Sequence, residues 1–61
     1  MKEFIKIQGV IVKLNQINYI VKDENKRFHI NFLNGSNTTI TFDNQNECLL
    51  TFNLISKYLI E

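Results

Sequence analysis

Two side chains in this 61-residue sequence have the reactivity that enzymes most often use, the imidazole of His29 and the thiol of Cys48. A catalytic His29 needs a nucleophile or an orienting carboxylate beside it. Asp23 and Asp43 are predicted at strand ends, where neither is an obvious partner. Cys48 falls on the predicted apolar face of a helix, which favours a small buried side chain over a reactive one. We therefore assign no catalytic residue and expect that the protein is not an enzyme.

Metal and cofactor sites are not indicated either. One cysteine and one histidine are too few to cage zinc, and Gly9 and Gly35 do not form a phosphate-binding loop. We therefore expect no metal and no cofactor. An unpaired cysteine suits a reducing compartment, and the opening stretch MKEFIKIQG interrupts its apolar residues with charge, unlike a signal peptide. These features predict a cytoplasmic protein.

Composition narrows the classes of partner. The net charge is +1, from seven basic and six acidic residues, and the basic residues are spread along the chain. Binding to nucleic acid draws on clustered Lys and Arg, so we do not expect it unless oligomerisation assembles a basic patch. The longest apolar run is far below the ~20 residues that span a bilayer, so no membrane partner is expected.

Alternation of apolar and polar residues predicts short strands at about 3–8, 10–14, 17–23, 27–33 and 38–42. After Phe42 the period changes, and a helix is predicted over about 45–60. Asn44 with Glu47 resembles a capping box at its start, with Asp43 as the alternative cap. The predicted fold class is α+β: one domain, 1–61, in which a small antiparallel β-meander of about four strands packs against one C-terminal α-helix.

The apolar pattern also predicts strand register. Placing Val21 opposite Phe28 puts Ile17, Tyr19 and Val21 on the core face and leaves a two-residue loop, Glu24-Asn25. In the next hairpin, matching apolar residues pairs Ile30 with Ile40, with a three- or five-residue loop around NGSN, and Gly9 permits a turn between the first two strands.

This register places polar side chains together on the other face of the sheet. Asn18 is expected beside Asn31 and Thr39, and Ile20 beside His29 and Thr41. Such a face is either an ordinary solvated surface or a shallow recognition surface rich in donors and acceptors, with nearby cations for a phosphate or an acidic partner. The candidate partner surface is Asn18, His29, Asn31, Thr39, Thr41, Lys6, Lys22 and Arg27.

The predicted helix has two apolar stripes. One contains Cys48, Phe52, Ile55 and Leu59 and faces the core, while Leu50, Leu54 and Tyr58 fall roughly opposite. A small domain buries little apolar surface, so self-association is the expected remedy, with a dimer favoured and the second stripe as the interface. A different helix rotation that buries part of this stripe stays open, since scattered surface leucines are normal.

The stretches INYI, FHINFLNGS, ITFDN and LLTFNLI, within residues 17–55, carry a resemblance. The chain resembles short Ile/Asn/Lys-rich proteins of AT-rich bacteria and their phages, and it has neither Ala nor Pro. The resemblance implies a non-enzymatic phage or mobile-element protein that blocks a host defence component, by binding a host protein or sequestering a nucleotide signal. The alternatives are a structural or interaction module that docks into a larger assembly, or a small nucleic-acid binder.

Overall fold

Five short strands and one α-helix form the structure of residues 4–60, the part of the chain that the computed structural model describes. In chain order the elements are β1 (Phe4–Ile7), β2 (Val10–Lys13), the 3-10 helix η1 (Leu14–Gln16), β3 (Ile17–Lys22), β4 (Arg27–Phe32), β5 (Asn37–Thr41) and α1 (Gln45–Ile60). The predicted α+β class is confirmed, and the helix has the predicted bounds. The first predicted strand began at Glu3, which lies outside the described residues.

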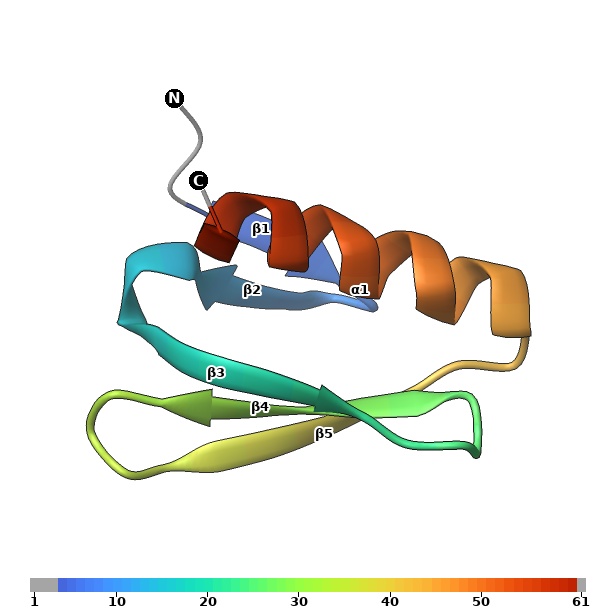
Figure 1. Ribbon diagram of the computed structural model, residues 1–61, viewed down its shortest axis with the longest axis horizontal. Helices are drawn as coiled ribbons and strands as arrows, with labels where there is room; N and C mark the ends of the chain where they lie inside the picture. Colours follow the sequence, from blue (N-terminus) through green and yellow to red (C-terminus); the bar gives the residue numbers. More distant parts are fainter. Residues whose placement is uncertain (1–3, 61) are drawn as a thin grey trace.

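The strands form two separate antiparallel sheets, β1-β2 and β3-β4-β5, so the meander is limited to the last three strands. Figure 1 shows α1 along one side of the molecule and the three-stranded sheet along the other, with β1 behind α1 in this view and β2 on the side of the helix nearer to the sheet. The unpredicted η1 turns the chain from one sheet to the other and buries Leu14. Ile7 and Val12 of the hairpin belong to the same buried cluster as residues of the larger sheet and helix. One core is therefore shared by all three layers.

The β1–β2 hairpin turns through Gln8 and Gly9, which confirms the turn predicted at the glycine. Both residues have positive φ, 50° and 84°, and the flanking Ile7 and Val10 pair directly. Such a two-residue turn matches the twist of the strands that it joins. The Gln8 side chain also donates a hydrogen bond from Nε2 to the carbonyl oxygen of Thr41, at 2.8 Å, so this turn contacts the edge of the larger sheet.

The β3–β4 register differs by one residue from the prediction along most of its length. The observed pairs include Val21 with His29 and Ile20 with Ile30. The loop takes three residues, 24–26, because Lys26 adopts a positive φ of 56°. A β-bulge at Asn18 then absorbs the extra residue, so Ile17 still pairs with Phe32 as predicted.

This shift changes which β3 side chains enter the core, because a slip of one residue moves every side chain to the other face. Tyr19 and Val21 were predicted inside, but they are 52% and 48% exposed. Ile20 instead packs against the buried cluster. The predicted core face of this strand is therefore wrong beyond Ile17, and the cause is the three-residue loop.

The β4–β5 register differs by two residues, which preserves the faces. Ile30 pairs with Thr38 and Phe28 with Ile40, where the prediction paired the two isoleucines. The loop has three residues, 33–35, one of the two predicted lengths, with Gly35 at φ 92°. Residues on the two sides of a strand alternate, so a slip of two leaves the predicted polar side polar.

Helix α1 begins with the predicted cap. The side-chain oxygen of Asn44 accepts hydrogen bonds from the backbone N–H groups of Asn46, at 2.7 Å, and Glu47, at 3.3 Å. These bonds satisfy donors that the first helical turn leaves without partners. No helix within residues 4–60 has the length and apolar character needed to cross a membrane.

The inward face of α1 is the predicted stripe. Cys48 and Ile55 are fully buried, and Phe52 and Leu59 pack against the cluster around them. The rings of Phe42 and Phe52 both lie 5.7 Å from that of Phe28, centroid to centroid, the first stacked and the second edge-on. The contact between Phe28 and Phe52 joins the helix to the sheet.

Candidate functional site

The polar side of the three-stranded sheet is the first candidate site. Alternation along the strands places one set of side chains on the side opposite the core. We call this set the outer sheet face: Tyr19, Val21, Arg27, His29, Asn31, Asn37, Thr39 and Thr41. His29 pairs directly with Thr39, and Arg27 with Thr41. Five of the eight predicted partner-surface residues therefore share one face: Arg27, His29, Asn31, Thr39 and Thr41.

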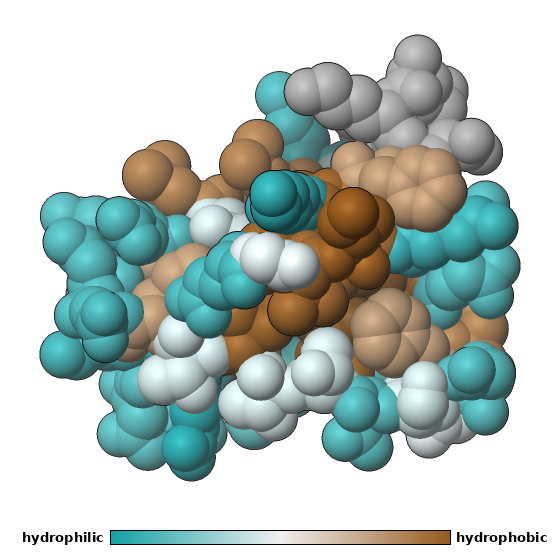
Figure 2. All heavy atoms as spheres, turned by 180° about the vertical axis from the view of Figure 1, so that it is seen from behind, coloured by the Kyte–Doolittle hydropathy of each residue, from teal (hydrophilic) through white to brown (hydrophobic). Residues whose placement is uncertain are grey.

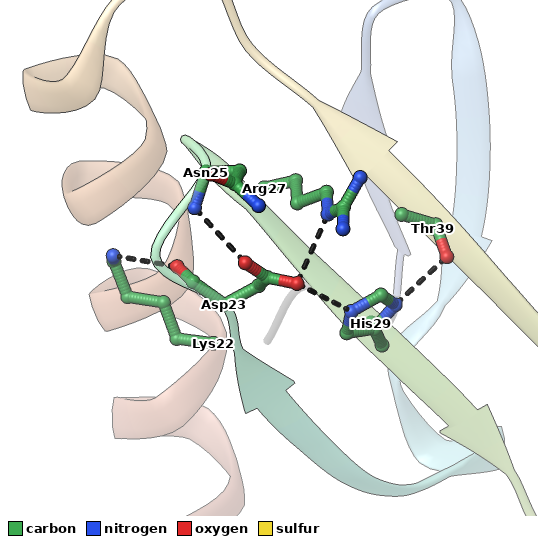
Figure 3. A network of polar contacts seen from close by, with 6 residues as sticks. All are labelled: Lys22, Asp23, Asn25, Arg27, His29 and Thr39. Atoms are coloured by element: carbon green, nitrogen blue, oxygen red, sulfur yellow. Dashed lines mark hydrogen bonds and ion pairs between the residues drawn. The ribbon is translucent and has the colours of Figure 1, made fainter.

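Three residues of the predicted surface lie elsewhere. Asn18 is the extra residue of the bulge, so Tyr19 takes the predicted place beside Asn31. Lys6 belongs to β1, in the other sheet. Lys22 donates from Nζ to the carbonyl oxygen of Asp23, at 3.2 Å, and Figure 3 shows its side chain on the α1 side of the loop, away from His29. The three predicted cations are therefore not assembled around one point.

A chain of polar contacts crosses the outer sheet face (Figure 3). The carboxylate oxygen Oδ2 of Asp23 lies 3.0 Å from Nε of Arg27 and 3.6 Å from Nε2 of His29. The other ring nitrogen of His29, Nδ1, lies 2.8 Å from the hydroxyl oxygen of Thr39. The contacts thus connect the β3–β4 loop to the outer strand β5.

Asp23 is the residue of this group that the sequence reasoning missed, since it was not expected to reach His29. The loop explains its position. Oδ1 of Asp23 accepts a hydrogen bond from the backbone N–H of Asn25, at 3.0 Å, while the Asp23 N–H bonds to the carbonyl of Arg27. This Asx turn is the local signal that indicates the geometry, because Asp followed by turn-forming residues favours it. The turn directs Oδ2 toward the sheet.

The charge state of Asp23 follows from these contacts. The hydrogen bond from the Asn25 backbone, followed by that from the Arg27 side chain, holds the pKa of the Asp23 carboxyl below its ordinary value of 3.8. The ionised carboxylate only accepts hydrogen bonds. His29 Nδ1 and the Thr39 hydroxyl form a hydrogen bond in which the donor depends on the tautomer of the imidazole.

Carboxylate, imidazole and hydroxyl in this order are also the parts of a nucleophilic catalytic site. Two features distinguish this group from such a site. The 3.6 Å separation of Asp23 and His29 is too long for a hydrogen bond, and Asp23, His29 and Thr39 are all accessible on an open sheet. Catalysis of that kind depends on donors held in a site that excludes water. Within residues 4–60, no group of three or more His, Cys, Asp and Glu side chains is placed to hold a metal ion.

The outward side of α1 is the second candidate site. Leu50 and Leu54, one helical turn apart, are 65% and 62% exposed, and we call them the exposed leucine pair. Tyr58, predicted to join them, is partly buried and packs against the core instead. At about 100° of rotation per residue, the position of Tyr58 around the helix axis is nearer to the inward stripe than the positions of Leu50 and Leu54 are.

A third candidate surface, also apolar, lies on the rear of the molecule. Figure 2 shows apolar side chains gathered in the middle of that face, in the region of the β1–β2 hairpin, with polar side chains around them. Val10 and Ile11 are among the exposed apolar residues of the hairpin. Lys6 pairs with Ile11 across the two strands, so a cation lies beside the apolar surface.

Comparison of the chain with known proteins finds no matching family model, no similar curated protein and no similar solved structure. The interpretation of these surfaces therefore depends on their geometry and chemistry.

Proposed function

We propose that this chain is a non-enzymatic binding protein that works as a homodimer. In this proposal the exposed leucine pair joins two copies, and the outer sheet face contacts a partner protein. The observation that carries the proposal is the exposure of Leu50 and Leu54 on a helix whose opposite face is already buried. Covering a leucine side chain fully contributes about 1.5–3 kcal/mol, so surface of this kind favours association.

The outer sheet face supports a protein partner rather than a small nucleotide. Small ligands bind in concave sites that enclose most of their surface, whereas this face is one side of an open sheet. Its cation, Arg27, is already paired with Asp23, so a phosphate would have to displace that carboxylate. Short amide and hydroxyl side chains such as Asn31 and Thr39 suit direct hydrogen bonds to another protein surface.

The biological role follows as part of the same proposal. The resemblance to short proteins of AT-rich bacteria and phages supports a role in which the protein covers a surface of a host defence protein. Covering needs no catalysis, and two identical outer sheet faces in one dimer allow two copies of a target to be held together.

Substitution of the exposed leucine pair tests the dimer. Leu54→Glu should convert the dimer to a folded monomer, because it places a carboxylate in the contact while removing nothing from the core. Ile60→Glu is the matched control on the same helix, since Ile60 is 85% exposed but points about 120° away. Sedimentation equilibrium gives the mass of each variant, and circular dichroism checks the fold.

An unchanged dimer mass for Leu54→Glu would contradict the proposed interface. Ile11→Glu then locates the alternative, because it changes the apolar surface of the β1–β2 hairpin in the same way. The kind of partner is tested separately. A purified nucleotide that raised the melting temperature would favour sequestration of a nucleotide over binding of a protein.

A further inference from the structure

The outward side of α1 carries an ordered pattern that includes more than leucine. Glu47, Leu50, Leu54 and Lys57 are all exposed and follow one another at intervals of three, four and three residues. At about 100° per residue they fall within about 80° of each other, on the side opposite the buried Cys48 and Ile55. We call these four residues the 3-4-3 stripe. The same spacing brings helices together in coiled coils.

The order of residues along the 3-4-3 stripe is self-complementary. Its ends carry opposite charges, Glu47 in the first helical turn and Lys57 in the last. If two copies meet in antiparallel orientation about a two-fold axis level with Phe52, Glu47 lies opposite the partner's Lys57 and Leu50 opposite the partner's Leu54. A parallel pair would instead place each charge against its own kind.

Building on the proposed dimer, we infer that its two subunits join through antiparallel α1 helices, in the register set by the 3-4-3 stripe. The occupant of this surface is thus a second copy of the chain, identified by its charge complementarity. Within residues 4–60 the ion pairs are those of Asp23 with Arg27 and His29, so Glu47 and Lys57 enter no pair there. Each is available to a partner copy.

The leucines and the charges have different roles in this contact. The two leucine layers supply most of the affinity, because they remove apolar surface from water. Exposed ion pairs contribute little affinity, but opposed like charges disfavour the wrong orientation. The contact spans about 15 Å of helix, which is small for a protein interface, so we expect a dissociation constant in the micromolar range.

Charge reversal at one end of the stripe tests the orientation. Glu47→Lys gives a helix with two positive ends, and Lys57→Glu gives one with two negative ends. In an antiparallel pair each variant opposes like charges at both ends, so self-association should weaken about ten-fold. An equimolar mixture of the two variants should form a heterodimer with near wild-type affinity, because both ends then carry opposite charges.

Matched controls separate this effect from loss of helix stability. Reversing Glu47 also removes a favourable charge from the start of the helix, and reversing Lys57 removes one from its end. Gln45→Lys and Ile60→Glu introduce the same charges in the same turns but away from the 3-4-3 stripe. Both should leave the dimer constant near that of wild type, and circular dichroism should show intact helix throughout.

The possible results test the inferred antiparallel register separately from the proposed dimer on which it rests. If the wild-type chain forms a dimer and neither Glu47→Lys nor Lys57→Glu changes its affinity, the antiparallel register is wrong. The proposed dimer would not be contradicted by that result. Weakened single variants that do not recover on mixing would overturn the register as well. A wild-type chain that stays monomeric at every concentration would overturn both.

Discussion

The two sides of α1 both carry apolar residues, but in different surroundings. On the inward side, Cys48 and Ile55 are fully buried against the sheet, and Phe52 contacts the ring of Phe28. On the outward side, Leu50 and Leu54 are mostly exposed and lie between a glutamate and a lysine. Apolar content alone does not separate the two sides. Spacing does not separate them either, because both stripes alternate intervals of three and four residues. Flanking charge does, because only the outward stripe has a charged residue at each end.

The largest difference between the two sides should appear on truncation to alanine. Ile55→Ala removes methyl groups from the fully buried core and should lower the free energy of unfolding by about 2–5 kcal/mol. Its cost should be the same at every chain concentration, because the contact lies within one chain. Urea unfolding at two concentrations measures both quantities.

Leu50→Ala is the counterpart on the outward side. It should change stability only at concentrations where the dimer forms, because mass action links association to folding. A large effect of Leu50→Ala in dilute solution would mean that this leucine stabilises the single chain, and the contrast between the two sides would fail.

Loss of the helix cap should lower the free energy of unfolding by a smaller amount, and this loss concerns the helix as a whole and not one of its sides. Asn44→Ala removes the acceptor for two backbone N–H groups and should cost about 1 kcal/mol. Asn44→Asp keeps an acceptor there and should restore most of the stability. If thermal unfolding showed no difference between Asn44→Ala and wild type, the cap would not contribute as the geometry implies.

Much of this architecture could be predicted from the sequence, because it depends on local pattern. The helix, its cap and its buried stripe follow from spacing and from the preference of Asn for the cap position. The face of β3 could not be predicted in the same way. It depends on the positive φ of Lys26 and the bulge at Asn18, and neither residue type signals this conformation as glycine would.

The outer sheet face shows the same limit. Residues on β4 and β5 were correctly placed together, because the register error there was two residues and left the faces unchanged. The approach of Asp23 to His29 was missed, because it depends on how the loop turns the carboxylate back over the sheet. Tyr19 and Val21 were missed for the same reason, since the loop sets which β3 residues point outward.

The smallest predicted effect concerns the pH dependence of the Asp23 contacts, away from both sides of α1. Because the pKa of Asp23 is lower in the folded chain than in the unfolded one, ionisation of its carboxyl favours folding. This contribution is complete above the ordinary pKa of 3.8 and disappears as the pH falls through the lower folded-state value. Asp23→Asn keeps an acceptor for the Asx turn but removes the charge.

The stability of wild type and Asp23→Asn should therefore differ slightly near neutral pH and converge in acid. Urea unfolding at about pH 7 and about pH 3 measures the two differences. The association constant should be the same for both proteins, because Asp23 lies in the β3–β4 loop and not on the 3-4-3 stripe. A stability difference that stayed constant with pH would contradict the assigned role of the carboxylate.

The mass of the wild-type chain in solution tests the central claim most directly. Sedimentation equilibrium between about 1 and 500 micromolar covers the range in which a small helix pair should dissociate. We predict a mass that rises from the 7.2 kDa of one chain toward twice that value as the concentration increases. A folded protein that stays at 7.2 kDa at the highest concentration would contradict the claim that α1 joins two copies.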